Sequence, residues 1–243
     1  MEMRRFLLTI FRKRDEKYGI ILGAMENIRV SLYVVARSVR ANVVPMLMLW
    51  GAAVLMVAAY YLSPSFASML EPLKAWQTER GPLAAAVNRI AFCGLLPGVF
   101  LCAIESIRPK RPFATVLAYS LWAALWGVLC DWFFTLQTVM FGSGRDIATL
   151  AAKTAVDQFV WTAIICTPVN SVFFAWVAGD FRKIDVIETV RNGYWTMLFA
   201  NWIVWMPVAA IVYMFPLALQ IQLVGLAGAF WMLSALAVGR KEC

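Results

Sequence analysis

Histidine is absent from the 243 residues of the sequence. This side chain is the commonest metal ligand in proteins and the one most often used as a general acid or base near neutral pH. Five cysteines are present, but no two of them form a Cys-x-x-Cys pair. We therefore expect no metal site, no disulfide framework and no histidine-based catalysis.

Charged residues are also scarce. They make up 15% of the chain, whereas about 25% is usual in soluble domains, and hydrophobic residues reach 62%. So few charges cannot cover a water-soluble particle, and so apolar a chain is not disordered. Phosphate-binding, dinucleotide-binding and zinc-protease motifs are missing as well. The composition predicts an integral membrane protein. Because histidine and these motifs are missing, a membrane enzyme is the least favoured class, and we expect no enzymatic activity and no cofactor.

The apolar residues are grouped into runs long enough to cross a bilayer, which takes about 20 residues. The longest uncharged run, 192–239, has 48 residues. As one helix it would measure about 72 Å, more than twice the hydrocarbon thickness. It must therefore fold back, most naturally near Pro216, and Pro207 should kink the helix before that. These runs predict an all-α, polytopic transmembrane helix bundle with about six spans, near residues 42–62, 83–106, 113–140, 157–178, 193–216 and 219–238.

The basic residues outside these spans predict the orientation of the bundle. The net charge is +8, and residues 1–41 alone carry nine Lys/Arg against four Asp/Glu. Counted over alternate loops, 17 basic residues fall on the amino-terminal side and four on the other, with Arg89 left inside a span. Because cytoplasmic loops are enriched in Lys and Arg, we expect both termini to lie inside.

Residues 20–40 have the pattern of an amphipathic helix. Arginines gather on one side and apolar residues on another. Such a helix either rests on anionic lipid or packs beneath the bundle, and the sequence leaves both open. The arginines are Arg29, Arg37 and Arg40, and the apolar residues are Ile28, Leu32, Val35 and Val39.

Several polar side chains fall within the predicted spans. Placing a charge at the middle of a span costs about 2.5–3.5 kcal/mol on insertion scales, so each needs a partner or water. Four of these residues are predicted at similar depth, and we expect them to form either a hydrated solute pathway or a structural ion pair with anchoring groups. They are Arg89, Asp131, Asp157 and Gln158. Asn170 and Asn201 are expected to form hydrogen bonds between helices.

Three motifs occur in the second half of the chain. Lys153 precedes Asp157-Gln158 by four residues, the run Asn201–Pro207 reads Asn-Trp-Ile-Val-Trp-Met-Pro, and Phe215-Pro216 follows. With Trp231 to Ser234, this pattern resembles the 22-kDa peroxisomal membrane protein family, also called the Mpv-seventeen family, over residues 76–238.

The resemblance implies a multi-pass protein of an organelle membrane, and some members of the family are described as non-selective channels. It would assign a pore-lining role to Asp157 and Gln158. It would assign a helix break or gate to Trp202, Trp205, Pro207 and Pro216.

The expected organisation has three parts: a basic amphipathic segment over 1–41, an additional first transmembrane helix and loop over 42–75, and a family-like bundle over 76–243. We expect a protein that forms or modulates a small-solute channel, the alternative being a non-catalytic structural or assembly protein. The expected partners are the lipid bilayer, anionic lipid at the basic segment and, compatibly with the sequence, a second copy of the chain, but no nucleic acid. A bacterial inner membrane and an organellar membrane both remain open.

Overall fold

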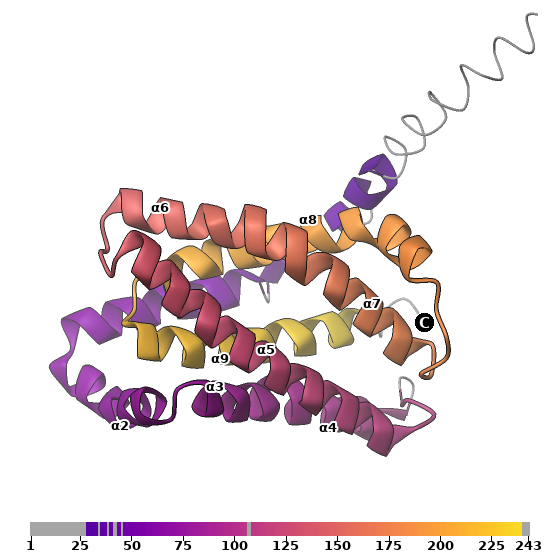
Figure 1. Cartoon of the computed structure of the whole chain (residues 1–243), viewed down its shortest axis with the longest axis horizontal. Coiled ribbons are helices and arrows are strands. Elements are labelled where there is room, and N and C mark those ends of the chain that lie inside the picture. Colours follow the sequence, from indigo (N-terminus) through magenta and orange to yellow (C-terminus); the bar gives the residue numbers. More distant parts are fainter. Residues whose placement is uncertain are drawn as a thin grey trace, which may run out of the picture.

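The computed structural model describes residues 28–33, 35–37, 39–40, 43–44, 46–105 and 108–239, with side chains up to residue 229. These residues form helices joined by short turns, with no strand among them (Figure 1). The all-α helix bundle is therefore confirmed. In chain order the elements are Met46–Leu62, α2 (Pro64–Arg80), α3 (Pro82–Arg89), η1 (Ile90–Leu95), α4 (Leu96–Ala103), α5 (Pro112–Phe141), α6 (Ile147–Ala155), η3 (Val156–Cys166), α7 (Thr167–Ala178), α8 (Val186–Val212) and α9 (Leu217–Gly239).

Four continuous helical segments in the described chain are long and apolar enough to cross a membrane: Pro82–Ala103, Pro112–Phe141, Ile147–Ala178 and Val186–Val212. A fifth candidate is the pair Met46–Leu62 and Pro64–Arg80, which is bent by 103°. The helix α9 occupies the sixth predicted position, and its part up to Ala229 is apolar but shorter. The chain is thus a multi-pass membrane protein.

The segment after the first apolar helix is helical, although the sequence predicted a loop there. Ser63 accepts a hydrogen bond from the Phe66 amide through its hydroxyl (3.3 Å), and Pro64 stands at the first helical position. A side-chain cap followed by proline is a typical start of a helix. The new helix, α2, therefore begins at a sharp angle to the one before it.

Two other helices begin earlier than the apolar runs suggested. Asp146 caps α6 by accepting from the Thr149 amide (3.0 Å), and Asp185 caps α8 by accepting from the Glu188 amide (2.9 Å). Both caps lie in charged loops, so the helices start ten and seven residues before the predicted span boundaries.

The helix α9 lies at the centre of the bundle. It contacts α2, α3, η1, α4, α5 and α8, and Figure 1 shows it in the middle of the molecule, between α3 and α8. The core at its amino-terminal half is formed by buried side chains of α3, α5, α8 and α9 together with the turn between α8 and α9. They include Ala85, Phe133, Phe134, Val208, Val212, Tyr213, Ile221 and Val224.

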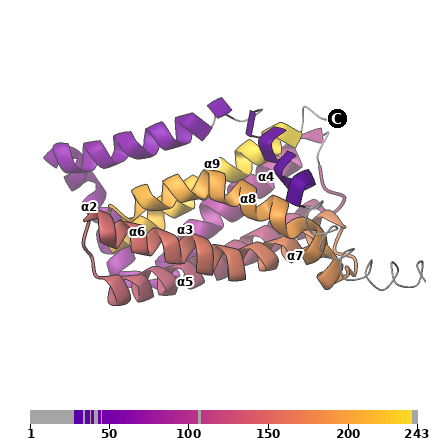
Figure 2. The same cartoon turned by 90° about the horizontal axis from the view of Figure 1, so that it is seen from above.

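The helix Met46–Leu62 runs along the flank of this bundle (Figure 2). The indole N–H of Trp50 donates to the carbonyl of Val204 (3.3 Å), and the Tyr61 hydroxyl donates to the carbonyl of Met214. Tyr61 also lies under the Arg145 guanidinium, 4.5 Å from its ring centroid. These contacts attach the helix to α8 and to two loops at one end of the molecule.

The amphipathic helix before it is described over part of residues 28–40. Ser31 and Val35 are buried, and the Thr196 hydroxyl of α8 donates to the Ser31 hydroxyl (2.8 Å). Arg29 and Arg40 are exposed. One side of this helix therefore packs on the bundle while arginines face outward, and residues 1–27 lie outside the described part.

Candidate functional site

Two π-helical segments lie within the transmembrane helices, η1 between α3 and α4 and η3 between α6 and α7. In each, the amide after the segment bonds five residues back, from Leu96 to Ala91 and from Thr167 to Thr162. A proline follows closely in both cases, Pro97 and Pro168. Because proline removes an amide donor and its ring would strike the carbonyl four residues before it, the widened turn relieves the clash.

The wider turn of η3 presents backbone carbonyls to α8. The indole N–H of Trp202 donates to the carbonyl of Gln158 (2.9 Å), and the Tyr194 hydroxyl donates to that of Ala163 (3.0 Å). Two aromatic donors thus hold α8 against η3. Within hydrocarbon such carbonyls need partners from neighbouring helices, and these contacts supply them.

The first polar cluster in the interior consists of Asp157, Tyr213, Gln137 and Lys153. Asp157 is 8% exposed, and one of its carboxylate oxygens accepts from the Tyr213 hydroxyl (2.9 Å). The same hydroxyl accepts from the side-chain amide of Gln137 (2.8 Å). Lys153, 2% exposed, places its ammonium 5.9 Å from the centroid of the Tyr213 ring. One tyrosine therefore joins polar groups of α5, α6 and η3.

Asp131 belongs to a second cluster, which links α2, α3, α5 and α9. The amide of Gln77 donates to Asp131 (2.9 Å), the amide of Gln222 donates to Gln77 (2.7 Å), and the amide of Asn88 donates to Gln222. Gln77, Asn88 and Gln222 are buried, while Asp131 is half-buried. A chain of three amides thus leads from a carboxylate into the bundle.

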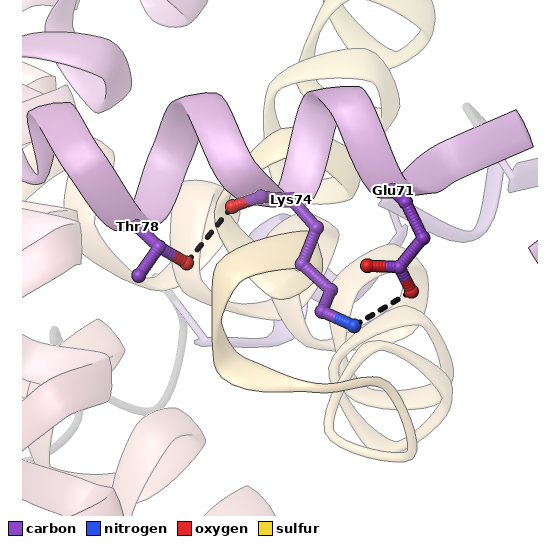
Figure 3. Close-up of polar contacts among 3 residues, drawn as sticks. All are labelled: Glu71, Lys74 and Thr78. Carbon is purple, nitrogen blue, oxygen red and sulfur yellow. Dashed lines mark hydrogen bonds and ion pairs between the residues drawn. The ribbon is translucent and has the colours of Figure 1, made fainter. Parts of the chain in front are cut away.

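The outer face of α2 has a different character from the face that carries Gln77. Figure 3 shows the Lys74 ammonium paired with Glu71 (2.7 Å) and the Thr78 hydroxyl donating to the Lys74 carbonyl (2.9 Å). This charged face indicates that α2 lies near an aqueous boundary, with Gln77 directed inward.

Arg89 lies between thiols. Its terminal nitrogens approach the sulfur of Cys130 (3.4 Å) and that of Cys93 (3.7 Å). The Cys93 thiol donates to the carbonyl of Gly225 (3.4 Å). Glycines on α9 make this approach feasible: a Cβ at Gly225 would strike the Asn88 amide, and one at Gly228 would lie 2.7 Å from the Cys93 sulfur.

The charged residues predicted to form one cluster bind different partners. Arg89 contacts thiols, Asp131 a glutamine and Asp157 a tyrosine, and within the described residues no ion pair joins them. Gln158 is buried beside Asp157, and its side-chain oxygen has no partner there. The four residues thus lie in adjoining polar clusters, and their role in a pathway stays a prediction.

The other predicted residues lie at helix contacts or at the turn. The Trp122 indole donates to Asn170 (3.0 Å), whereas Asn201 is half-buried in α8. Trp205 packs against the core and Pro207 lies within α8. The chain reverses between Val212 and Leu217, at Phe215-Pro216.

Sequence reasoning missed the uncharged members of these clusters: Gln77, Asn88, Gln137, Tyr213 and Gln222. Amides at Gln137 and Gln222 within apolar runs were a usable signal, because amides in a span need partners just as charges do. Gln77 offered no such signal, since it lies in a polar segment. Tyr213 resembled an ordinary interfacial aromatic residue.

An apolar groove of about 340 Å³ lies on the side of the bundle, between α6–η3 and α8. Thr154 is the polar residue among its walls, which are otherwise hydrophobic. Such a surface suits lipid contact. Its lining residues are Ile147, Leu150, Ala151, Thr154, Ala155, Phe159, Met206 and Ala210.

Comparison with known protein families gives a match in the second half of the chain. The Mpv17 / PMP22 family is matched over residues 181–233, which cover α8 and the first part of α9. The resemblance expected from the tryptophan- and proline-containing motif is therefore confirmed over this segment. No curated protein and no solved structure matches the chain.

Proposed function

We propose that this membrane protein forms or modulates a pathway for small polar solutes and carries out no catalysis. The observation that carries the proposal is the polar interior contributed by α2, α3, α5, α6, η3 and α9. Buried polar groups are costly inside a bilayer, and those that persist usually mark substrate or ion routes.

The two π-helical segments support the same proposal. Such segments occur preferentially at functional sites, and here Asp157 and Gln158 lie in η3 while Asn88 and Arg89 immediately precede η1. The resemblance to a family with members described as channels points in the same direction.

Solute flux through liposomes containing the purified protein tests this function. Glycerol-sized neutral solutes and small ions should leave faster than from empty liposomes, and Asp157→Asn and Arg89→Ala should change that rate. Glu71→Gln is the matched control, because Glu71 is exposed on the outer face of α2. Flux equal to that of empty liposomes would reject the pathway. Wild-type flux in both interior variants would retain a pathway but place it elsewhere.

A structural or assembly role is the second candidate, favoured by the way the polar groups bind one another. The hydroxyl of Tyr213 and the amide chain from Gln77 to Asn88 give hydrogen bonds to several helices at once. In that case the interior variants lose stability while no protein-dependent flux is seen in any of them.

A further inference from the structure

The apolar groove between α6–η3 and α8 lies on helices that cross the membrane. Three of its lining residues are alanines, Ala151, Ala155 and Ala210, and their small side chains leave the hollow between the two helices. Thr154 adds only carbon atoms to the wall, because its hydroxyl oxygen is buried. The groove is therefore a hydrocarbon-lined hollow on the surface of the bundle.

The dimensions of the groove are too small for a helix and fit a single alkyl chain. Its volume is about 340 Å³. One turn of a helix with its side chains, about 10–12 Å wide and 5.4 Å tall, occupies roughly 420–610 Å³. Along α6 and η3 the groove runs from Ile147 to Phe159, a rise of about 18 Å. A narrow hollow of this length suits one acyl chain of a lipid.

One end of the groove lies at the membrane surface, beside a cation. Ile147 lines this end and directly follows the loop between α5 and α6, which carries Arg145. On α8, Met214 lies one turn beyond the lining residue Ala210. The Met214 carbonyl accepts from the Tyr61 hydroxyl, and the Arg145 guanidinium lies 4.5 Å from the centroid of the Tyr61 ring. The guanidinium is thus held at headgroup depth, and the groove leads from there into a leaflet whose hydrocarbon is about 15 Å deep.

Arg145 has the donors that a phosphate group needs. Its side chain is exposed, and no carboxylate oxygen of the described residues lies within 4.0 Å of it. The neighbouring carboxylate of Asp146 accepts instead from the amide and hydroxyl of Thr149. A guanidinium over an aromatic ring keeps its N–H donors for other partners. At headgroup depth the matching anion is the phosphodiester of a phospholipid, which a guanidinium binds through two parallel hydrogen bonds.

We infer that the groove between α6–η3 and α8 binds one acyl chain of a glycerophospholipid whose phosphodiester pairs with Arg145. The lipid belongs to the leaflet next to the loop between α5 and α6. This binding does not depend on the proposed solute pathway.

Native mass spectrometry of the full chain measures the bound lipid directly. The protein is purified in detergent, and phosphatidylglycerol or a diacylglycerol with the same two chains is added at equal concentration. The wild type should retain one phosphatidylglycerol, and its Tm should rise by about 3–6 °C at a lipid concentration ten times the Kd. The diacylglycerol should bind about tenfold more weakly, because it lacks the phosphate that accepts charge-assisted hydrogen bonds.

Two variants separate the groove from the cation. Ala151→Phe fills the groove and should lose the lipid, whereas Ala148→Phe adds the same ring to an exposed position of α6 outside the groove and should retain it. Arg145→Gln should bind the two lipids equally. Arg80→Gln, which removes an exposed arginine of α2, should keep the preference for phosphatidylglycerol. All four positions are exposed, so the variants are expected to fold.

Three results would overturn the inference. Retention of phosphatidylglycerol by Ala151→Phe at the wild-type level would show that the lipid binds outside the groove. Equal binding of the two lipids by the wild type would remove the contact with Arg145. A lipid-free dimer of the wild type that Ala151→Phe no longer forms would assign the groove to a second copy of the chain.

Discussion

At the scale of single residues, the hydroxyl of Tyr213 holds the first polar cluster together. It donates to Asp157 and accepts from Gln137, so the donor and an acceptor site of one oxygen are both used. The side-chain oxygen of Gln137 has no partner in the described interior. Removing the hydroxyl would leave the amide of Gln137 and the carboxyl of Asp157 to find new partners in an apolar surrounding.

Tyr213→Phe should therefore lower the free energy of unfolding by about 1–3 kcal/mol, the cost of leaving buried polar groups unpaired. Unfolding of the solubilised protein by denaturant measures the change. Tyr33→Phe is the matched control, because Tyr33 is 70% exposed. Equal stability of Tyr213→Phe and the wild type would contradict the role given to this hydroxyl.

Asp146 predicts a dependence of stability on pH. It lies in the loop before α6, where the amide and hydroxyl of Thr149 donate to its carboxylate and hold its pKa below the usual value. A lowered folded-state pKa stabilises the fold above the unfolded pKa of about 3.9. That contribution is lost as the pH falls through the folded pKa.

The Tm difference between the wild type and Asp146→Ala should therefore be constant above about pH 5 and shrink at lower pH. Asp146→Asn retains a capping oxygen without the charge and should fall between the two. Thermal unfolding of the wild type and both variants across this pH range measures these Tm differences. A difference that persists unchanged at the acid end would contradict the assignment.

The sequence predicted some of the polar residues of the interior but not their partners. Arg89, Asp157 and Gln158 stood out because charged or amide groups are rare in apolar runs. Their partners did not stand out: Gln77 reaches the interior from a helix that is polar overall, and cysteines near Arg89 look like ordinary apolar residues. Partner choice depends on which helices are neighbours, and spacing along one helix does not contain that information.

At the scale of elements, the apolar runs located the transmembrane helices but not their ends. Asp146 and Asp185 extend α6 and α8 into charged loops by capping them. The π-helical segments precede Pro97 and Pro168. A proline within a helix can either widen the turn before it or kink the helix. The sequence alone allows both outcomes.

Gly127 controls the contact between α5 and α3. A Cβ at this position would lie 2.5 Å from the carbonyl oxygen of Ala85, which is backbone and cannot rotate away. Gly127→Ala should therefore destabilise the protein by about 1–3 kcal/mol through overpacking. At Gly193 of α8 an added Cβ would have no atom within 4 Å, so Gly193→Ala should stabilise by about 0.5–1 kcal/mol.

The two glycine variants are compared by denaturant unfolding under one set of conditions. Changes of opposite sign in the free energy of unfolding would support close packing of α3 on α5, because both substitutions add the same methyl group to a helix. A stabilising effect at both positions would show that α5 lies farther from α3 than the structure places it.

At the scale of the whole molecule, the position of α9 organises the rest. Its run looked like one more transmembrane helix in the sequence, yet it contacts six other elements and carries Gln222, Gly225 and Gly228 into the polar interior. Because α8 and α9 are joined by a turn of only four residues, they are antiparallel neighbours. The remaining neighbours of α9 depend on side-chain fit among all helices, so the one-dimensional pattern could not predict them.

The helix order also predicts which loops share a side of the membrane. Since the continuous helical segment Ile147–Ala178 separates them, the loop after α5, around Ser143, and the loop after α7, around Lys183, should lie on opposite sides. The basic residues near Lys183 place that loop inside by the positive-inside rule.

A membrane-impermeant maleimide applied from outside should therefore label Ser143→Cys in intact vesicles, whereas Lys183→Cys should react only after permeabilisation. Labelling of the unsubstituted chain, which has its own cysteines, is the control. Labelling of both variants from one side would contradict the span count between these loops, and the reverse pattern would keep the bundle but invert its orientation.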